Sequence, residues 1–158
     1  MRDWVGELGL EPHAEGGYFR RIYTSAHTLS LPRGPRPAAT SIHYLLTRDA
    51  PRGRLHRNQS DILHFLIDGG PLEYVTLAPD GTLDRVRLGP DDERFLLVPG
   101  GHWKASHLVD GAAHGLVAEV VTPGFDHADH EFATERDLRG FPDANDALRP
   151  FLSARPTR

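Results

Sequence analysis

The sequence contains no cysteine, which excludes a disulfide framework and a zinc site built on thiolates. No run approaches the roughly 20 apolar residues of a membrane-spanning helix, and the first residues lack the apolar stretch of a secretory signal. Clustered basic residues are also absent, and 18 Lys and Arg against 22 Asp and Glu give a net charge of -4. We therefore expect a cytoplasmic protein that binds neither a membrane nor nucleic acid.

Glycine and proline are abundant, with 16 and 13 residues, and they separate short apolar segments. Short strands divided by turn residues are typical of a β-sandwich or β-barrel. The length of 158 residues suits a single domain, 1–158, whose barrel covers about residues 16–132. The expected strands are residues 18–23, 40–46, 53–56, 61–67, 72–77, 83–88, 95–98, 102–108 and 114–121. Segments 33–37 and 123–132 are expected to be loops, the second with an edge strand as the alternative.

Short helices are expected at both ends of this all-β chain. Asp3 can cap a helix that runs to about Gly9. After the barrel, Thr134 and Asp143 can each cap one short helix within residues 134–152. These helices are expected to pack outside the barrel.

Two stretches carry the most specific pattern in the chain. The first runs from Gly53 through His56 and His64 to Gly69, and the second is Pro99-Gly-Gly101-His102-Trp103-Lys104. A histidine at a strand end, another inside an apolar strand, a glycine turn and a Pro-x-Gly turn together resemble the skeleton of a cupin. This resemblance implies a double-stranded β-helix, which is the jelly-roll barrel of that superfamily.

Most metal-ligand positions of that skeleton hold other residues in this chain. A cupin metal site needs three imidazoles and a carboxylate around one cation. His56 occupies the first ligand position, but Asn58 stands at the second and Lys104 at the last. Ile62 or Leu63 stands where the superfamily has glutamate. An ammonium carries no lone pair and repels a cation, so the pattern indicates a pocket that works without a metal.

Five separated motifs resemble the DUF985, or cupin-5, family in the order in which they occur. They are Pro12-His13-x-Glu15-Gly16-Gly17-Tyr18-Phe19-Arg20, His56-Arg57 with Ser60-Asp61, Gly70-Pro71-Leu72-Glu73, Val98-Pro99-Gly100-Gly101-x-Trp103, and Pro123-Gly124-Phe125-Asp126. The resemblance covers about residues 8–132 and implies a homodimer. The family's Glu, Trp and His correspond to Ile62, His64 and Phe65 here, so the roles of those side chains do not carry over.

His56 is the leading candidate for a catalytic base. Its Gly-x-x-His setting resembles that of the base histidine in dTDP-sugar epimerases of the same superfamily, which use His and Tyr without a metal. An imidazole can take a proton from the carbon beside a carbonyl, and a Tyr or Lys can return one. Tyr18, Tyr44 and Lys104 are the candidates for acid or anchor, and Lys104 is expected to face His56 across the cavity. The competing interpretation has His56 bonded to a turn and Lys104 at the surface.

Eight residues are candidates for binding the substrate: Glu15, Arg20, His43, Tyr44, His64, His102, Trp103 and Glu119. Arg20 can hold a carboxylate or phosphate through two hydrogen bonds, or form a salt bridge at a dimer edge. His64 lies among apolar neighbours and is either a core histidine or a pocket group. Glu119 in an apolar strand needs a partner, for which Lys104 and Arg20 are the candidates. Trp103 is expected to pack in the core, with a pocket wall as the alternative.

Three functional hypotheses remain open at this point. The leading one is a small-molecule cupin enzyme without a cofactor that isomerises, epimerises, dehydrates or cyclises a polar or carbonyl-bearing metabolite by proton transfer. A second is a cupin that binds such a small molecule without turnover. A third is a metal-dependent oxygenase or isomerase with one divalent ion at His56, His64 and His102, assisted by His43.

Overall fold

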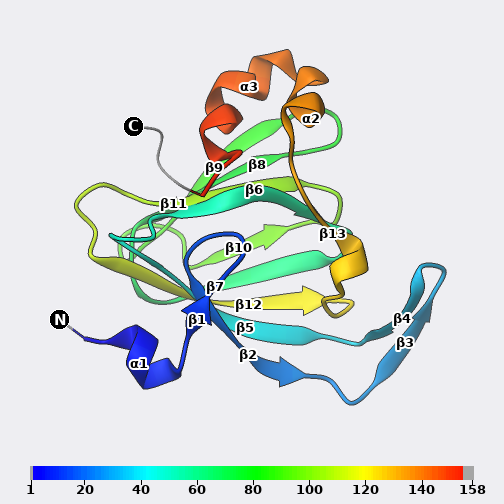
Figure 1. Ribbon diagram of the computed structural model, residues 1–158, viewed down its shortest axis with the longest axis horizontal. Coiled ribbons are helices and arrows are strands. Elements are labelled where there is room, and N and C mark those ends of the chain that lie inside the picture. The colour runs from blue at the N-terminus through cyan, green and yellow to red at the C-terminus, as the bar shows by residue number, and fades with distance from the viewer. Residues whose placement is uncertain (1, 155–158) are drawn as a thin grey trace.

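The computed structural model (Figure 1) describes residues 2–154, which form two antiparallel β-sheets and a separate β-hairpin. The six-stranded sheet has the order β1 (Glu11–Pro12), β2 (Tyr18–Thr24), β5 (Thr40–Thr47), β12 (His114–Thr122), β7 (Asp61–Gly69) and β10 (Phe95–Val98). The five-stranded sheet has the order β13 (His130–Phe132), β6 (Arg52–Asn58), β11 (Trp103–Leu108), β8 (Leu72–Leu77) and β9 (Leu83–Leu88). The predicted strands all form, with bounds that differ by at most two residues. The two sheets enclose one interior, which makes the fold a jelly-roll barrel, or double-stranded β-helix.

One end of the barrel interior is apolar. Its side chains come from both sheets and are Tyr44, Leu46, Leu72, Tyr74, Leu88, Leu108 and Val117. On β5, Tyr44 and Leu46 point inward, while Leu45 between them packs on the outer face. Inward and outward side chains therefore alternate along β5, as the two-residue period of a β-strand requires.

The C-terminal helices cover the outer face of the five-stranded sheet. They are α2 (Glu135–Arg139), α3 (Pro142–Leu148) and the 3-10 turn Arg149–Phe151. Leu138, Leu148 and Phe151 from these segments pack against Leu55 and Trp103 of the sheet. Trp103 is therefore a packing residue under the helices, as expected, and does not form a pocket wall. No helix in the described part of the chain is long and apolar enough to cross a membrane.

The N-terminal helix α1 (Trp4–Leu8) packs on the outer face of the six-stranded sheet. The Asp3 side chain accepts the backbone N–H of Gly6, and Gly9 ends the helix in the left-handed conformation. Both features follow the helix-capping preferences that predicted this helix from the sequence.

The structure corrects the sequence prediction at two segments. Residues 33–37 do not form a plain loop, because β4 (Gly34–Pro37) pairs with β3 (Thr28–Leu31) in a hairpin that projects from the barrel (Figure 1). Proline is tolerated there because the two-stranded hairpin consists only of edge strands. Helix α3 begins at Pro142 rather than after a cap at Asp143, since proline is favoured at the first helical position.

Candidate functional site

The other end of the barrel interior is polar. His56, His64, Lys104 and Glu119 are buried there, each with at most 6% of its surface exposed. Lys104 and His56 are direct partners on the neighbouring strands β11 and β6, and Glu119 and His64 are direct partners on β12 and β7. Directly paired residues point to the same face of a sheet. His56 and Lys104 therefore lie side by side on one wall, which corrects the expectation that they face each other across the cavity.

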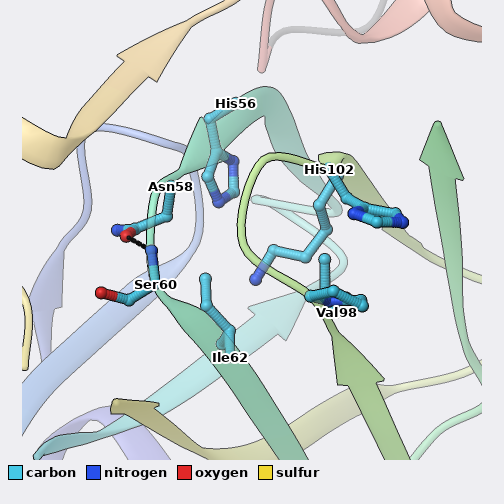
Figure 2. Close-up of a pocket in the computed structure, with 8 residues that line it drawn as sticks. His56, Asn58, Ser60, Ile62, Val98 and His102 are labelled. Carbon is cyan, nitrogen blue, oxygen red and sulfur yellow. Dashed lines mark hydrogen bonds between the residues drawn. The ribbon is translucent and has the colours of Figure 1, made fainter. Parts of the chain in front are cut away.

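A narrow pocket lies beside His56 (Figure 2); its empty space of about 180 Å³ includes open solvent, and the side chains around it leave no enclosed space as large as a water molecule. Its lining residues are His56, Asn58, Ser60, Ile62, Val98, Pro99, His102 and Lys104. Figure 2 shows the His56 ring directed into this space between Asn58 and His102. The imidazole of His102 turns away from that of His56, so the two rings do not converge on one point.

The protonation state of the His56 ring follows from its hydrogen bonds. Nδ1 lies 2.7 Å from the carbonyl oxygen of Arg54, which can only accept, so Nδ1 carries the proton in the neutral ring. Nε2 then has a free lone pair, and it lies 3.4 Å from Oε1 of Glu15. A lone pair and a carboxylate at this distance repel each other unless a proton or a cation lies between them. A proton or a cation between Nε2 of His56 and the Glu15 carboxylate would therefore be stabilised.

Glu15 enters the interior from the turn before β2. Gly16 and Gly17 in this turn have φ of 96° and 72°, which favours glycine over any other residue. The backbone N–H of Glu15 donates to Nδ1 of His13 at 2.9 Å, and its carbonyl oxygen accepts the N–H of Arg54 at 2.6 Å. These bonds tie the turn to β6 and hold the carboxylate beside His56.

Burial and neighbouring charges set the ionisation of this pair. Burial lowers the pKa of His56 to about 4, with Lys104 adding to the shift and Glu15 opposing it, so the ring is neutral at pH 7. Burial also opposes ionisation of Glu15, but His56, the hydrogen bond with His130 and the charge of Lys104 outweigh it. They hold the pKa of the Glu15 carboxyl well below its usual range, and Glu15 is ionised.

Lys104 takes part in a second buried network. Nδ1 of His64 lies 3.1 Å from the carbonyl oxygen of Leu96, so Nε2 is the acceptor and takes a hydrogen bond from Nζ of Lys104 at 2.8 Å. Nζ also lies 3.5 Å from Oε1 of Glu119, so Lys104 rather than Arg20 is the partner of Glu119. Burial raises the pKa of Glu119, and Lys104 opposes that shift. An ammonium has three N–H donors, so one remains for an oxygen atom in the pocket.

Two tyrosines separate the polar end from the apolar end. The Tyr44 hydroxyl donates to the carbonyl oxygen of Gly16 at 2.8 Å. The Tyr74 ring meets His64 edge-on at 4.9 Å, and its buried hydroxyl has no hydrogen-bond partner within residues 2–154. Burial raises the pKa of both phenols, so both remain protonated donors.

Three predicted site residues lie on the outer face of the six-stranded sheet. The inward side chain of β2 is Phe19, so Tyr18 and Arg20 point away from the interior, and His43 is the direct partner of Arg20. The Tyr18 hydroxyl donates to Asp49 at 2.6 Å instead. The structure therefore does not bring Tyr18 to His56, and it places Arg20 and His43 outside the pocket.

Sequence reasoning missed three members of the polar interior. His130 lies with Nε2 3.2 Å from Oε1 of Glu15, and Nε2 of His13 lies 4.0 Å from the same oxygen. Tyr74 is the third. His13 could have been recognised from its place beside Glu15 in one motif, but His130 follows an acidic loop and reaches the site only because β13 pairs with β6.

The positions that hold a metal ion in cupins do not fit one here. Asn58 uses its side-chain oxygen to accept the N–H of Ser60, and Lys104 supplies a cation rather than a lone pair. His64 directs its Nε2 lone pair to Lys104, so His56, His64 and His102 do not form a ligand set. Within residues 2–154, one group of His and Glu side chains lies close enough to share an ion, and it consists of Glu15, His56 and His130.

Comparisons with known proteins show the family and the fold of the chain. Residues 2–133 match the profile of the family described as "Cupin superfamily (DUF985)". The chain is 34% identical over 155 residues to the uncharacterized protein YML079W of Saccharomyces cerevisiae, with 87% of this chain and 77% of that protein covered. A hypothetical protein from Leishmania major has a similar structure, with a TM-score of 0.87, 30% identity, and 94% and 96% of the two chains covered. A variant of Bacillus subtilis oxalate decarboxylase shares the fold alone. It is 14% identical to this chain, with a TM-score of 0.60 and with 92% of this chain and 38% of that chain covered.

Proposed function

Because the chain belongs to the DUF985 family of the cupin superfamily, we propose that it is an enzyme that moves a proton on a small carbonyl-bearing metabolite without a metal cofactor. The observation that carries this proposal is the buried His56 ring, whose Nε2 lone pair meets the Glu15 carboxylate at 3.4 Å beside the pocket. Structural neighbours of the chain include proteins named as enzymes, which is consistent with catalysis in a barrel of this kind.

The proposed step uses three side chains. His56 Nε2 takes a proton from the carbon beside a carbonyl; the electron pair of that C–H bond forms a C=C bond, and the π pair of the carbonyl moves to its oxygen. The free N–H of Lys104 stabilises the resulting oxyanion, because an ammonium in a buried site interacts strongly with a developing negative charge. The carboxylate of Glu15 stabilises the imidazolium that forms. Return of the proton from the His56 imidazolium to another carbon on the same face gives an isomer.

Proton exchange with solvent tests this proposal directly. The purified protein is incubated in D₂O with a panel of ketoses, oxo acids and keto-sugar nucleotides, together with any ligand that native mass spectrometry finds bound. We expect one member to gain a deuterium at the carbon beside its carbonyl. A ligand that binds tightly but never gains deuterium or changes otherwise would instead identify a binding protein without turnover.

We also propose that the chain forms a homodimer, as the family resemblance implies. Support comes from four exposed apolar side chains on the adjacent strands β7 and β10, which form the outer face of one edge of the six-stranded sheet. They are Phe65, Ile67, Phe95 and Leu97, with 42% to 46% of their surfaces exposed. The rings of Phe65 and Phe95 lie 5.3 Å apart. Exposed apolar patches of this kind mark interaction sites, and a two-fold axis lets one patch bind its own copy.

The dimer is tested by mass in solution. Light scattering should give twice the chain mass of 17.5 kDa for the native protein and the single mass for the Phe65→Glu/Phe95→Glu variant. The Leu29→Glu variant alters an exposed apolar residue on the projecting hairpin and should stay dimeric. A native protein that is monomeric at tens of micromolar would rule out this interface.

A further inference from the structure

Three side chains from separate parts of the chain meet at one point beside the pocket. Glu15 comes from the turn before β2, His56 from β6 and His130 from the first position of β13. Oε1 of Glu15 lies 3.4 Å from Nε2 of His56 and 3.2 Å from Nε2 of His130. One ligating atom from each side chain lies within 4.8 Å of the others. We call these three residues the triad.

The spacing of the triad agrees with tetrahedral coordination. Zinc bonds of 2.0–2.1 Å at tetrahedral angles place neighbouring ligand atoms about 3.3 Å apart. Both distances from Glu15 are close to this value. Two imidazoles and a carboxylate are also the ligand types that late first-row divalent ions accept, whereas Mg²⁺ and Ca²⁺ prefer oxygen ligands.

The triad is held in place before any ion arrives. The Arg54 carbonyl oxygen accepts the His56 Nδ1 proton, which is the outer hydrogen bond that orients most metal-binding histidines. The turn that carries Glu15 is tied to the same strand through the N–H of Arg54. The rings of His56 and His130 stack with their centres 5.2 Å apart, and Phe125 and Phe132 pack against His130.

One neighbouring charge opposes a bound cation. Lys104 is the cross-strand partner of His56, and its ammonium repels any ion at the triad. Its charge is directed at His64 and Glu119, at 2.8 Å and 3.5 Å, which reduces the repulsion. Affinity is therefore expected to be weaker than in a site without a neighbouring lysine.

We propose that Glu15, His56 and His130 bind one late first-row divalent metal ion, for which Zn²⁺ is the probe, and that the bound ion prevents His56 from accepting a proton. The second part rests on the proposed function, because the ion and the proton need the same Nε2 lone pair. The first part is independent of it. In this role the ion is an inhibitor of proton transfer and occupies a different ligand set from that of other cupins.

The binding experiment needs no substrate. Calorimetric titration of the tag-free protein with Zn²⁺ should show one saturable site per chain. The His130→Asn and Glu15→Gln variants should each weaken it at least about tenfold. The matched control is His127→Asn, which removes an exposed histidine of the same segment and should leave the affinity unchanged. Absence of a saturable site, or an equal loss in the control, would overturn the proposal.

The second part is read from deuterium exchange in the presence of Zn²⁺. Exchange by the native protein should fall as the site fills and recover when a chelator is added. Exchange by His130→Asn should resist the same Zn²⁺ concentration. If the zinc-loaded protein exchanges as fast as the free one or faster, inhibition is refuted while the titration still decides whether the site exists. If no compound exchanges, the proposed function fails and the titration stands alone.

Discussion

Replacement of His56 by glutamine is expected to lower the rate of deuterium exchange by about 1000-fold, within the usual range for loss of a general base. The amide of glutamine can preserve the hydrogen bond to Arg54 but has no nitrogen lone pair that accepts a proton. Nε2 of His56 offers such a lone pair at the pocket, whereas the Nε2 of His64 is bonded to Lys104.

The measurement is the initial rate of exchange together with the melting temperature. The variant should melt within a few degrees of the native protein, because glutamine fills much of the same space. His107→Gln is the matched control, since His107 is a half-buried histidine of the same sheet outside the pocket, and it should exchange at the native rate. Glu15→Gln should lose roughly tenfold, because only the stabilisation of the imidazolium is removed. Native exchange by the His56→Gln variant would remove this residue from the mechanism.

Replacement of Arg36 by methionine is expected to destabilise the fold by about 3 kcal/mol, because it leaves a buried carboxylate without its main partner. Nε and Nη2 of Arg36 each donate to one oxygen of Asp129 at 2.8 Å. The side chain of Asp129 is 1% exposed, and Arg33 at 3.3 Å is its remaining cation. This pair ties the projecting hairpin to the 3-10 helix His127–Asp129, which directly precedes β13, so it also positions His130.

Urea denaturation of the native and variant proteins measures this effect, and the melting temperature should fall by roughly 6 to 12 °C. The control is Arg149→Met, which breaks an exposed pair with Glu135 at 2.9 Å and should cost less than about 1 kcal/mol. The double variant Arg36→Met/Asp129→Leu should recover part of the loss, because the buried carboxylate is removed as well and only the partly exposed Arg33 keeps a charge there. A loss for Arg36→Met as small as that of the control would contradict the buried-charge argument.

The sequence predicted the barrel well because its signals are local. Alternating side chains and turn residues define each strand over a few positions, and the caps at Asp3 and Thr134 define two helices in the same way. The hairpin at residues 28–37 was missed because its prolines argue against a strand, and only pairing between two edge strands accommodates them.

The site was predicted in part. His56, His64, Lys104 and Glu119 were candidates for the pocket, with a surface position as the alternative for Lys104, and all four lie buried on inward faces. The two-residue period does not determine which of the two faces of β2 points inward. Tyr18 and Arg20 were therefore assigned to the pocket, although Phe19 is the side chain of β2 that packs in the interior.

By itself, the sequence determined the fold class, the approximate bounds of nine strands and the loss of the usual cupin metal ligands at Asn58 and Lys104. The tertiary structure alone decided that Glu15 and His130 meet His56, and that Lys104 stands beside His56 rather than opposite it. The physical reason is that strand periodicity acts over neighbouring residues, whereas strand pairing joins residues distant in the chain. Only such pairing brings β13, β6 and the turn before β2 to one point.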